Sequence, residues 1–184
     1  MTLDINWWSF GQARREATDN IQTFITKLLS EDTASGRVMV VRNIRILSRC
    51  PRCNHDDEHL THVLTCGAAS TIELRDNLLS DLVLWLESVY TSPTIVNFVN
   101  LGLSTWFLNQ HHEWSYNSHI FSHNQQEDKA LQSQLNVGSF YLLSGMITSD
   151  MINLQQQYYT RIESQKLGSR WITDFTQKLW HIHH

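Results

Sequence analysis

Three cysteines and a histidine lie close together in the sequence, with a spacing typical of metal ligands. Cys50 and Cys53 form a Cys-x2-Cys pair, and His62 precedes Cys66 by four residues. A tight turn brings both sulfurs of such a pair to one ion, and residues four apart share one face of a helix. Three thiolates and one imidazole form a closed tetrahedral set, which is typical of structural rather than catalytic zinc. The sequence therefore predicts a structural Zn²⁺ cofactor held by Cys50, Cys53, His62 and Cys66.

The fourth ligand has two competitors, because His55 and His59 lie in the same stretch. His59 would leave six residues before Cys66 and would not give the one-turn geometry, so His62 is preferred. Three buried thiols without a metal are the remaining alternative. An odd number of cysteines within seventeen residues disfavours a disulfide scaffold and favours metal binding in a reducing compartment.

A basic segment leads into this cluster. Between residues 37 and 52 there are five arginines and no acid, namely Arg37, Arg42, Arg45, Arg49 and Arg52. Guanidinium groups can hold phosphates with paired hydrogen bonds, so this segment is the candidate contact with RNA or DNA. The alternative is an ordinary solvated face whose arginines pair with Asp56, Asp57 and Glu58. Because the net charge is −4, any nucleic-acid contact would have to be local and weak.

The cluster resembles a known family. Cys-Pro-x-Cys, eight residues and His-Val-Leu-x-Cys look like the zinc-binding segment at the C-terminal end of non-LTR retroelement reverse transcriptases. Short flanking motifs are similar to uncharacterised retroelement-like open reading frames of diatoms and related algae: Gly36-Arg37-Val38-Met39, Gln156-Gln157-Tyr158-Tyr159, Gly168-Ser169-Arg170-Trp171 and Lys178-Leu179-Trp180. The resemblance implies a detached, non-catalytic tail of a mobile-element protein with weak nucleic-acid binding. The chain is too short for a polymerase and has no aromatic-x-Asp-Asp turn.

Helical periodicity predicts the body that positions the cluster, and the expected fold is mainly α, a helical bundle with a small inserted Cys3His zinc finger. The firmest element is a helical hairpin, with a capping box Ser70-x-x-Glu73 at its start and Ser92-Pro93 opening its second helix. The residues around 37–47 fit a strand or a short helix, and 111–128 reads as a long polar loop. The expected helices cover 7–29 (one broken helix or two), 70–90, 93–107, 131–146, 150–162 and 169–179.

Composition bounds the remaining possibilities. The 184 residues include only two prolines and seven glycines, which favours helices, and no apolar run approaches the ~20 residues of a membrane span. Residues 1–5 lack a secretory signal, so we expect an intracellular protein that is not secreted. The expected organisation is an N-terminal helical segment (1–49), the finger (50–66) and a helical domain (67–184) in one compact unit.

No catalytic motif is recognisable, so we expect no enzyme activity and no small-molecule substrate. Histidines at 111, 112, 119 and 123 could bind a second metal, although a polar loop is the better interpretation. The alternative function is a structural or protein-interaction helical domain that docks onto a partner or a second copy, or a non-functional mobile-element remnant. Core packing is the expectation for the tryptophans at 7, 8, 106, 114, 171 and 180.

Overall fold

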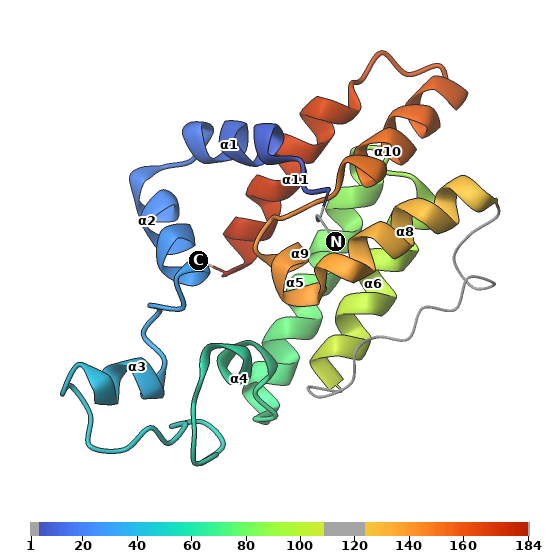
Figure 1. Ribbon diagram of the computed structural model, residues 1–184. Helices are drawn as coiled ribbons and strands as arrows, with labels where there is room; N and C mark the ends of the chain where they lie inside the picture. Colours follow the sequence, from blue (N-terminus) through green and yellow to red (C-terminus); the bar gives the residue numbers. More distant parts are fainter. Residues whose placement is uncertain (1–3, 109–123, 184) are drawn as a thin grey trace.

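The computed structural model describes residues 4–108 and 124–183, and these residues form an all-α fold (Figure 1). They contain ten helices and no strand beyond one isolated antiparallel bridge between Ile5 and Thr148. The expectation of a mainly α protein is confirmed. The helices are α1 (Trp7–Glu16), α2 (Asp19–Leu29), α3 (Gly36–Val41), α4 (Leu60–Thr65), α5 (Ala69–Ser88), α6 (Pro93–Leu108), α8 (Gln125–Val137), α9 (Ser139–Leu143), α10 (Ser149–Arg161) and α11 (Gly168–His183).

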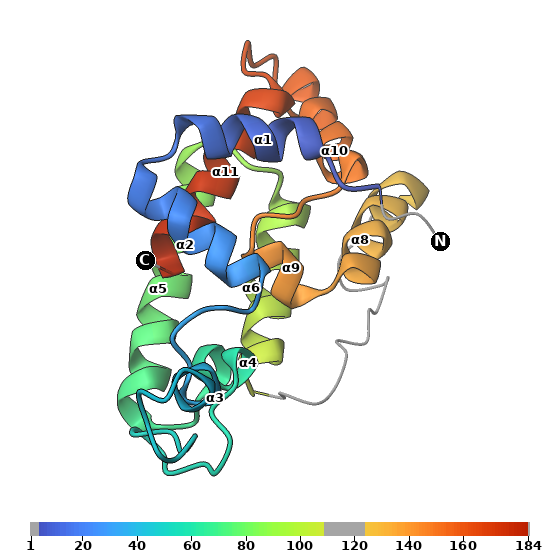
Figure 2. The same cartoon turned by 60° about the vertical axis from the view of Figure 1, so that its left-hand side comes forward.

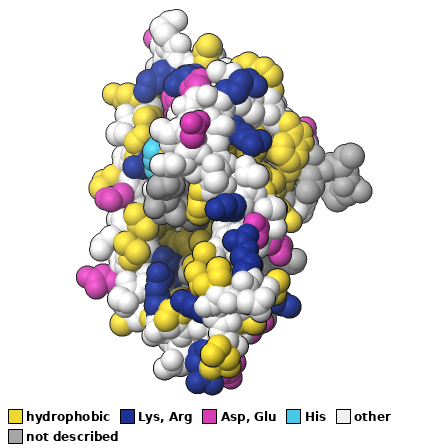
Figure 3. Space-filling model, turned by 90° about the vertical axis from the view of Figure 1, so that its left-hand side faces the viewer, with side chains coloured by type: hydrophobic (Ala, Val, Ile, Leu, Met, Phe, Trp, Pro, Cys, Tyr) yellow, Lys and Arg dark blue, Asp and Glu magenta, His cyan; other side chains and the backbone are white. Residues whose placement is uncertain are grey.

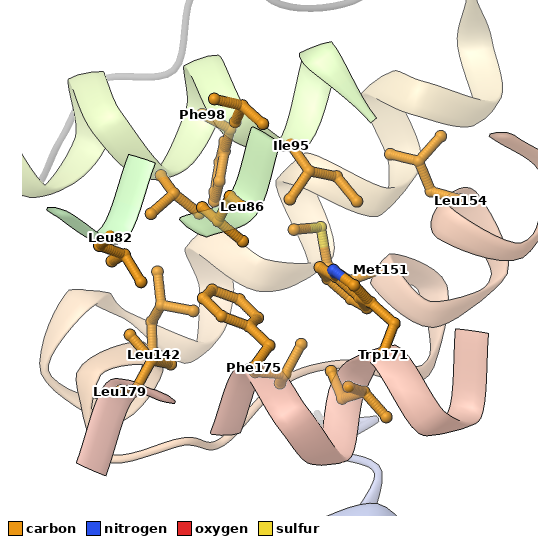
Figure 4. Close-up of a cluster of buried hydrophobic side chains, with 14 of the residues drawn as sticks. Leu82, Leu86, Ile95, Phe98, Leu142, Met151, Leu154, Trp171, Phe175 and Leu179 are labelled. Atoms are coloured by element: carbon orange, nitrogen blue, oxygen red, sulfur yellow. The ribbon is translucent and has the colours of Figure 1, made fainter. Parts of the chain in front are cut away.

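The main core forms where the α5–α6 hairpin packs against α8, α10 and α11. Apolar side chains at helical spacing on each element point into one cluster, as the labelled residues in Figure 4 show. Phe175 of α11 is fully buried there, between the rings of Trp85 and Trp171. The predicted hairpin is therefore confirmed, and its second helix begins at Pro93 as expected.

A second, smaller core joins α1 and α2 to the end of α11. Phe10 meets the fully buried Trp180 edge to face, with ring centroids 5.4 Å apart. The Trp180 indole N–H donates to the Ser144 carbonyl at 2.9 Å, so its polar atom is satisfied inside the core. Helix α11 thus contributes to both clusters and holds the N-terminal helices on the hairpin body.

Gly138 divides the helix expected over residues 131–146, and Gly145 follows the end of its second part. Gly138 has φ 96° and ends α8, and Gly145 has φ 86° just after α9. A Cβ on Gly145 would lie 2.8 Å from the Trp180 indole nitrogen, so close packing also requires glycine there. The structure therefore has two helices in place of one.

Three other expectations about local structure are wrong. Helix α5 begins at Ala69 after Ala68, so Ser70 lies inside the helix and no capping box forms. The predicted polar loop extends too far, because Asn124 caps α8 with its side-chain oxygen and 125–128 are helical. The rest of that loop, with all four histidines of the second-metal hypothesis, lies outside the described residues.

The third error concerns the tryptophans of α1. Trp171 and Trp180 are buried as expected, but Trp7 and Trp8 are 57% and 66% exposed. Two large aromatic side chains of α1 therefore lie in solvent. Within the described part of the chain, no helix is long and apolar enough to span a lipid bilayer.

Candidate metal centre

The finger occupies one end of the helical body, where α4 lies beside the start of α5 in both ribbon views (Figure 2), and α3 lies farther from α5 in Figure 1. A tight turn opens it. The Asn54 backbone N–H donates to the Cys50 carbonyl at 2.9 Å, and the Cys50 N–H donates to the His55 carbonyl at 2.8 Å. Asn54 has φ 61°, a left-handed conformation that asparagine tolerates better than most residues. The turn folds Cys53 back towards Cys50.

Helix α4 supplies the other two groups. His62 lies in its first turn, and Cys66 is the residue that ends it. His59 caps this helix, because its ring nitrogen Nδ1 accepts a hydrogen bond from the His62 backbone N–H at 3.1 Å. The structure therefore gives His59 a capping role and places the His62 ring in the cluster.

The four predicted ligand groups converge. One atom from each of Cys50, Cys53, His62 and Cys66 lies within 4.8 Å of all the others. The Sγ atoms of Cys50 and Cys66 are 3.9 Å apart, and the Cys53 Sγ lies 3.2 Å from His62 Nε2. A tetrahedral zinc ion with Zn–S bonds of about 2.3 Å places its sulfur ligands about 3.8 Å from one another. The side chains present therefore fit a zinc ion in number, type and spacing.

Burial and the neighbouring groups set the protonation states of these ligands. Burial raises the pKa of the Cys50 thiol to about 11. Burial also acts to raise the pKa of Cys66, but hydrogen bonds from the Ala68 backbone and the two other thiols hold that pKa below its usual value. A divalent cation bound between these side chains would favour the thiolate form of both cysteines.

The imidazole of His62 is kept neutral by its surroundings. Burial lowers its pKa, and positive charge on His55 and His59 lowers it further. The His55 ring stacks on the His62 ring with centroids 4.5 Å apart. Neutral imidazole is the form that binds metal, so the environment favours a ligand at this position.

Glu58 ties the finger to α3. Its backbone N–H donates to the Ser48 carbonyl at 2.8 Å, and its own carbonyl accepts from the Arg37 N–H at 3.0 Å. Its buried carboxylate accepts from the Gly36 N–H at 2.8 Å. A Cβ on Gly36 would lie 2.5 Å from the Ser48 carbonyl oxygen, so this close approach requires glycine.

We expect Gly36→Ala to destabilise the zinc-loaded protein by about 1–3 kcal/mol, because the added methyl meets backbone that cannot move freely. Urea unfolding followed by circular dichroism measures this cost. Gly67→Ala is the matched control, since nothing lies within 4 Å of its added Cβ. Equal midpoints for the two variants would contradict the packing described here.

Four of the five arginines of the basic segment have carboxylate partners. The pairs are Arg37–Asp57 (3.9 Å), Arg42–Asp32, Arg45–Glu58 (3.5 Å) and Arg49–Asp56 (2.9 Å). Three of these carboxylates, those of Asp56, Asp57 and Glu58, are the partners expected if the arginines form an ordinary solvated face. Asp32 is an additional partner. Arg52, at the tip of the Cys-x2-Cys turn, has no carboxylate partner among the described residues.

Arg75 of α5 is not among the residues that the sequence predicts for a site. Its Nη1 donates to the Leu64 carbonyl at 3.1 Å, which links α5 to α4 beside Cys66. Its guanidinium carbon lies 5.1 Å from the centre of the Phe107 ring, and burial lowers its pKa. The sequence offers one signal, because Arg75 is the only basic residue between Gly67 and Asp128.

Comparison with known proteins identifies no family to which this chain is similar. No protein-family model, no curated protein and no solved structure matches this chain. The resemblance to the zinc-binding segment of reverse transcriptases therefore stays a prediction from the motifs.

Proposed function

We propose that this chain is a non-catalytic zinc-binding module in which a structural Zn²⁺ ion fixes the finger on a helical body. The observation that carries the proposal is the convergence of three sulfurs and one imidazole nitrogen within 4.8 Å. Four protein ligands satisfy a tetrahedral zinc ion and leave no open position for water or substrate. The role of the metal is then to hold the chain between α3 and α5 in one conformation.

Exchange of each histidine for asparagine tests the ligand set. We expect the purified wild type and His59→Asn to contain one zinc per chain, and His62→Asn to lose most of its zinc. Asparagine is a good helix cap, so His59→Asn removes an imidazole while it preserves the start of α4. Elemental analysis of the three proteins gives the stoichiometry.

Two outcomes would contradict this assignment. Loss of zinc from His59→Asn with retention in His62→Asn would make His59 the ligand. A wild type purified in the presence of zinc but without stoichiometric metal would remove the proposed function.

We also propose that the basic segment binds nucleic acid weakly. The resemblance of the finger to reverse-transcriptase tails supports RNA or DNA as the partner, and the ion pairs explain why the contact is weak. Each exposed pair must open before its arginine meets a phosphate, although such pairs contribute little to stability. Arg52 has no carboxylate partner among the described residues, so no ion pair must open before it meets a phosphate.

Fluorescence anisotropy with a labelled single-stranded RNA and its DNA equivalent tests this contact. We expect measurable binding at about 50 mM salt that falls by at least tenfold at about 200 mM, as for a few phosphate contacts. Arg52→Gln should weaken it equally for all sequences. Absence of binding at the lower salt concentration would exclude the nucleic-acid contact and leave the zinc module intact.

A further inference from the structure

An apolar groove of about 180 Å³ lies between the finger and the helical hairpin. Val63 and Leu64 of α4 form part of its wall, and Leu74 and Leu78 of α5 also line it, with Phe107 of α6. Figure 3 shows the side of the molecule that lies on the left in Figure 1. A hollow on this side has hydrophobic side chains inside it and basic side chains at its margin. The groove is open to solvent, and Leu74 within it is 54% exposed.

Two guanidinium groups also line this groove, those of Arg52 and Arg75. Neither forms an ion pair with a carboxylate among the described residues, in contrast to the four other arginines of the finger region. The Nε atom of Arg75 is buried and has no hydrogen-bond partner in the same part of the chain. A buried donor of this kind costs free energy until an acceptor reaches it. The groove therefore combines an apolar surface with two guanidinium groups that have no carboxylate partner in the described part of the chain.

We propose that this groove binds an amphiphilic carboxylate, with the alkyl chain on the leucine-lined surface and the carboxylate between Arg52 and Arg75. Arginine binds carboxylates with paired, charge-assisted hydrogen bonds, and the apolar surface accepts a hydrocarbon chain without polar cost. We expect no small-molecule substrate from the sequence, and the proposed occupant is a bound ligand that undergoes no reaction.

The proposal rests on the proposed zinc function in one respect. Arg52 lies between two zinc-binding cysteines, and Val63 and Leu64 lie between His62 and Cys66. The metal thus holds one wall of the groove and one of its two charges. Removal of zinc is therefore expected to abolish carboxylate binding together with the local fold.

Calorimetric titration of the zinc-loaded protein with decanoate tests the proposal, and decanol serves as the uncharged probe of equal length. We expect decanoate to bind at least about tenfold more tightly than decanol, as charge-assisted hydrogen bonds predict. Methyl NMR spectra should show shifts concentrated on the leucines of the groove.

Two pairs of variants locate the site. Leu74→Glu places a carboxylate in the groove and should abolish decanoate binding, whereas Leu84→Glu should leave it unchanged. Both leucines lie on α5 and are more than half exposed, so both variants should fold. Arg52→Gln should weaken binding at least fivefold, and Arg49→Gln, which removes an arginine outside the groove, should not.

Zinc measured in the same samples separates the two proposals. Protein with one zinc per chain that fails to bind decanoate would overturn the groove and leave the zinc module standing. Equal binding of decanol and decanoate, or equal effects of Leu74→Glu and Leu84→Glu, would also overturn it. Binding that survives zinc removal would overturn the dependence on the finger.

Discussion

Removal of zinc is expected to unfold residues 48–68 while the helical body keeps its secondary structure. The finger has one short helix, its buried apolar side chains are those of Cys50 and Cys66, and its ligand side chains converge on one point. Zinc binding in small fingers supplies about 10–16 kcal/mol, which is coupled to local folding. The hairpin and α11 have a separate apolar core, so the loss should stop near the start of α5.

Hydrogen exchange with and without a chelator measures this prediction. Amides of the Cys50–Asn54 turn and of α4 should exchange at least a hundredfold faster in the metal-free protein. Amides of α6 and α11 provide the internal control and should change little. Uniform loss of protection across all helices would show that the body depends on the metal, and no change anywhere would show that the finger folds without it.

Phe175→Ala is expected to cost about 3–5 kcal/mol in the free energy of unfolding, the usual range for a large side chain removed from a core. The Phe175 ring is fully buried and lies 5.2 Å and 6.3 Å, centroid to centroid, from the rings of Trp171 and Trp85. Its loss leaves a cavity between α5 and α11, and α11 also carries Trp180 for the second core. One substitution should therefore weaken both clusters.

Urea unfolding of the zinc-saturated protein gives this free energy. Trp8→Ala is the control, because it removes a larger aromatic ring that is 66% exposed, and it should change stability by less than about 0.5 kcal/mol. A Phe175→Ala cost as small as that of Trp8→Ala would mean that α11 does not pack as described.

Local patterns were sufficient to predict much of this fold. Apolar spacing over 70–90 and 93–107 predicted the α5–α6 hairpin, since long periodic segments have few alternatives. The Cys-x2-Cys pair and the His62–Cys66 interval predicted groups that the structure brings together, because a turn and a helical repeat fix short-range geometry. The choice of His62 over His59 followed from the same one-turn argument.

Features that depend on tertiary contacts could not be predicted in this way. The sequence indicates which residues are apolar but not which face of α1 meets α11, so it does not predict the exposure of Trp7 and Trp8. The groove around Arg75 forms only where α4, α5 and α6 meet, and no periodicity within one helix reports it. The capping box at Ser70 failed because Ala68 and not Ser70 precedes the helix, a boundary that propensity alone leaves uncertain by a residue or two.

Zinc K-edge X-ray absorption of the purified protein identifies the atoms that bind the metal. We expect three sulfur ligands at about 2.3 Å and one nitrogen ligand at about 2.0 Å, with no further oxygen at bonding distance. Zinc that remains in His62→Asn should lack the nitrogen ligand, whereas His59→Asn should give the wild-type spectrum. A shell of oxygen and nitrogen alone, or a fifth ligand from solvent, would contradict a closed structural site formed by Cys50, Cys53, His62 and Cys66.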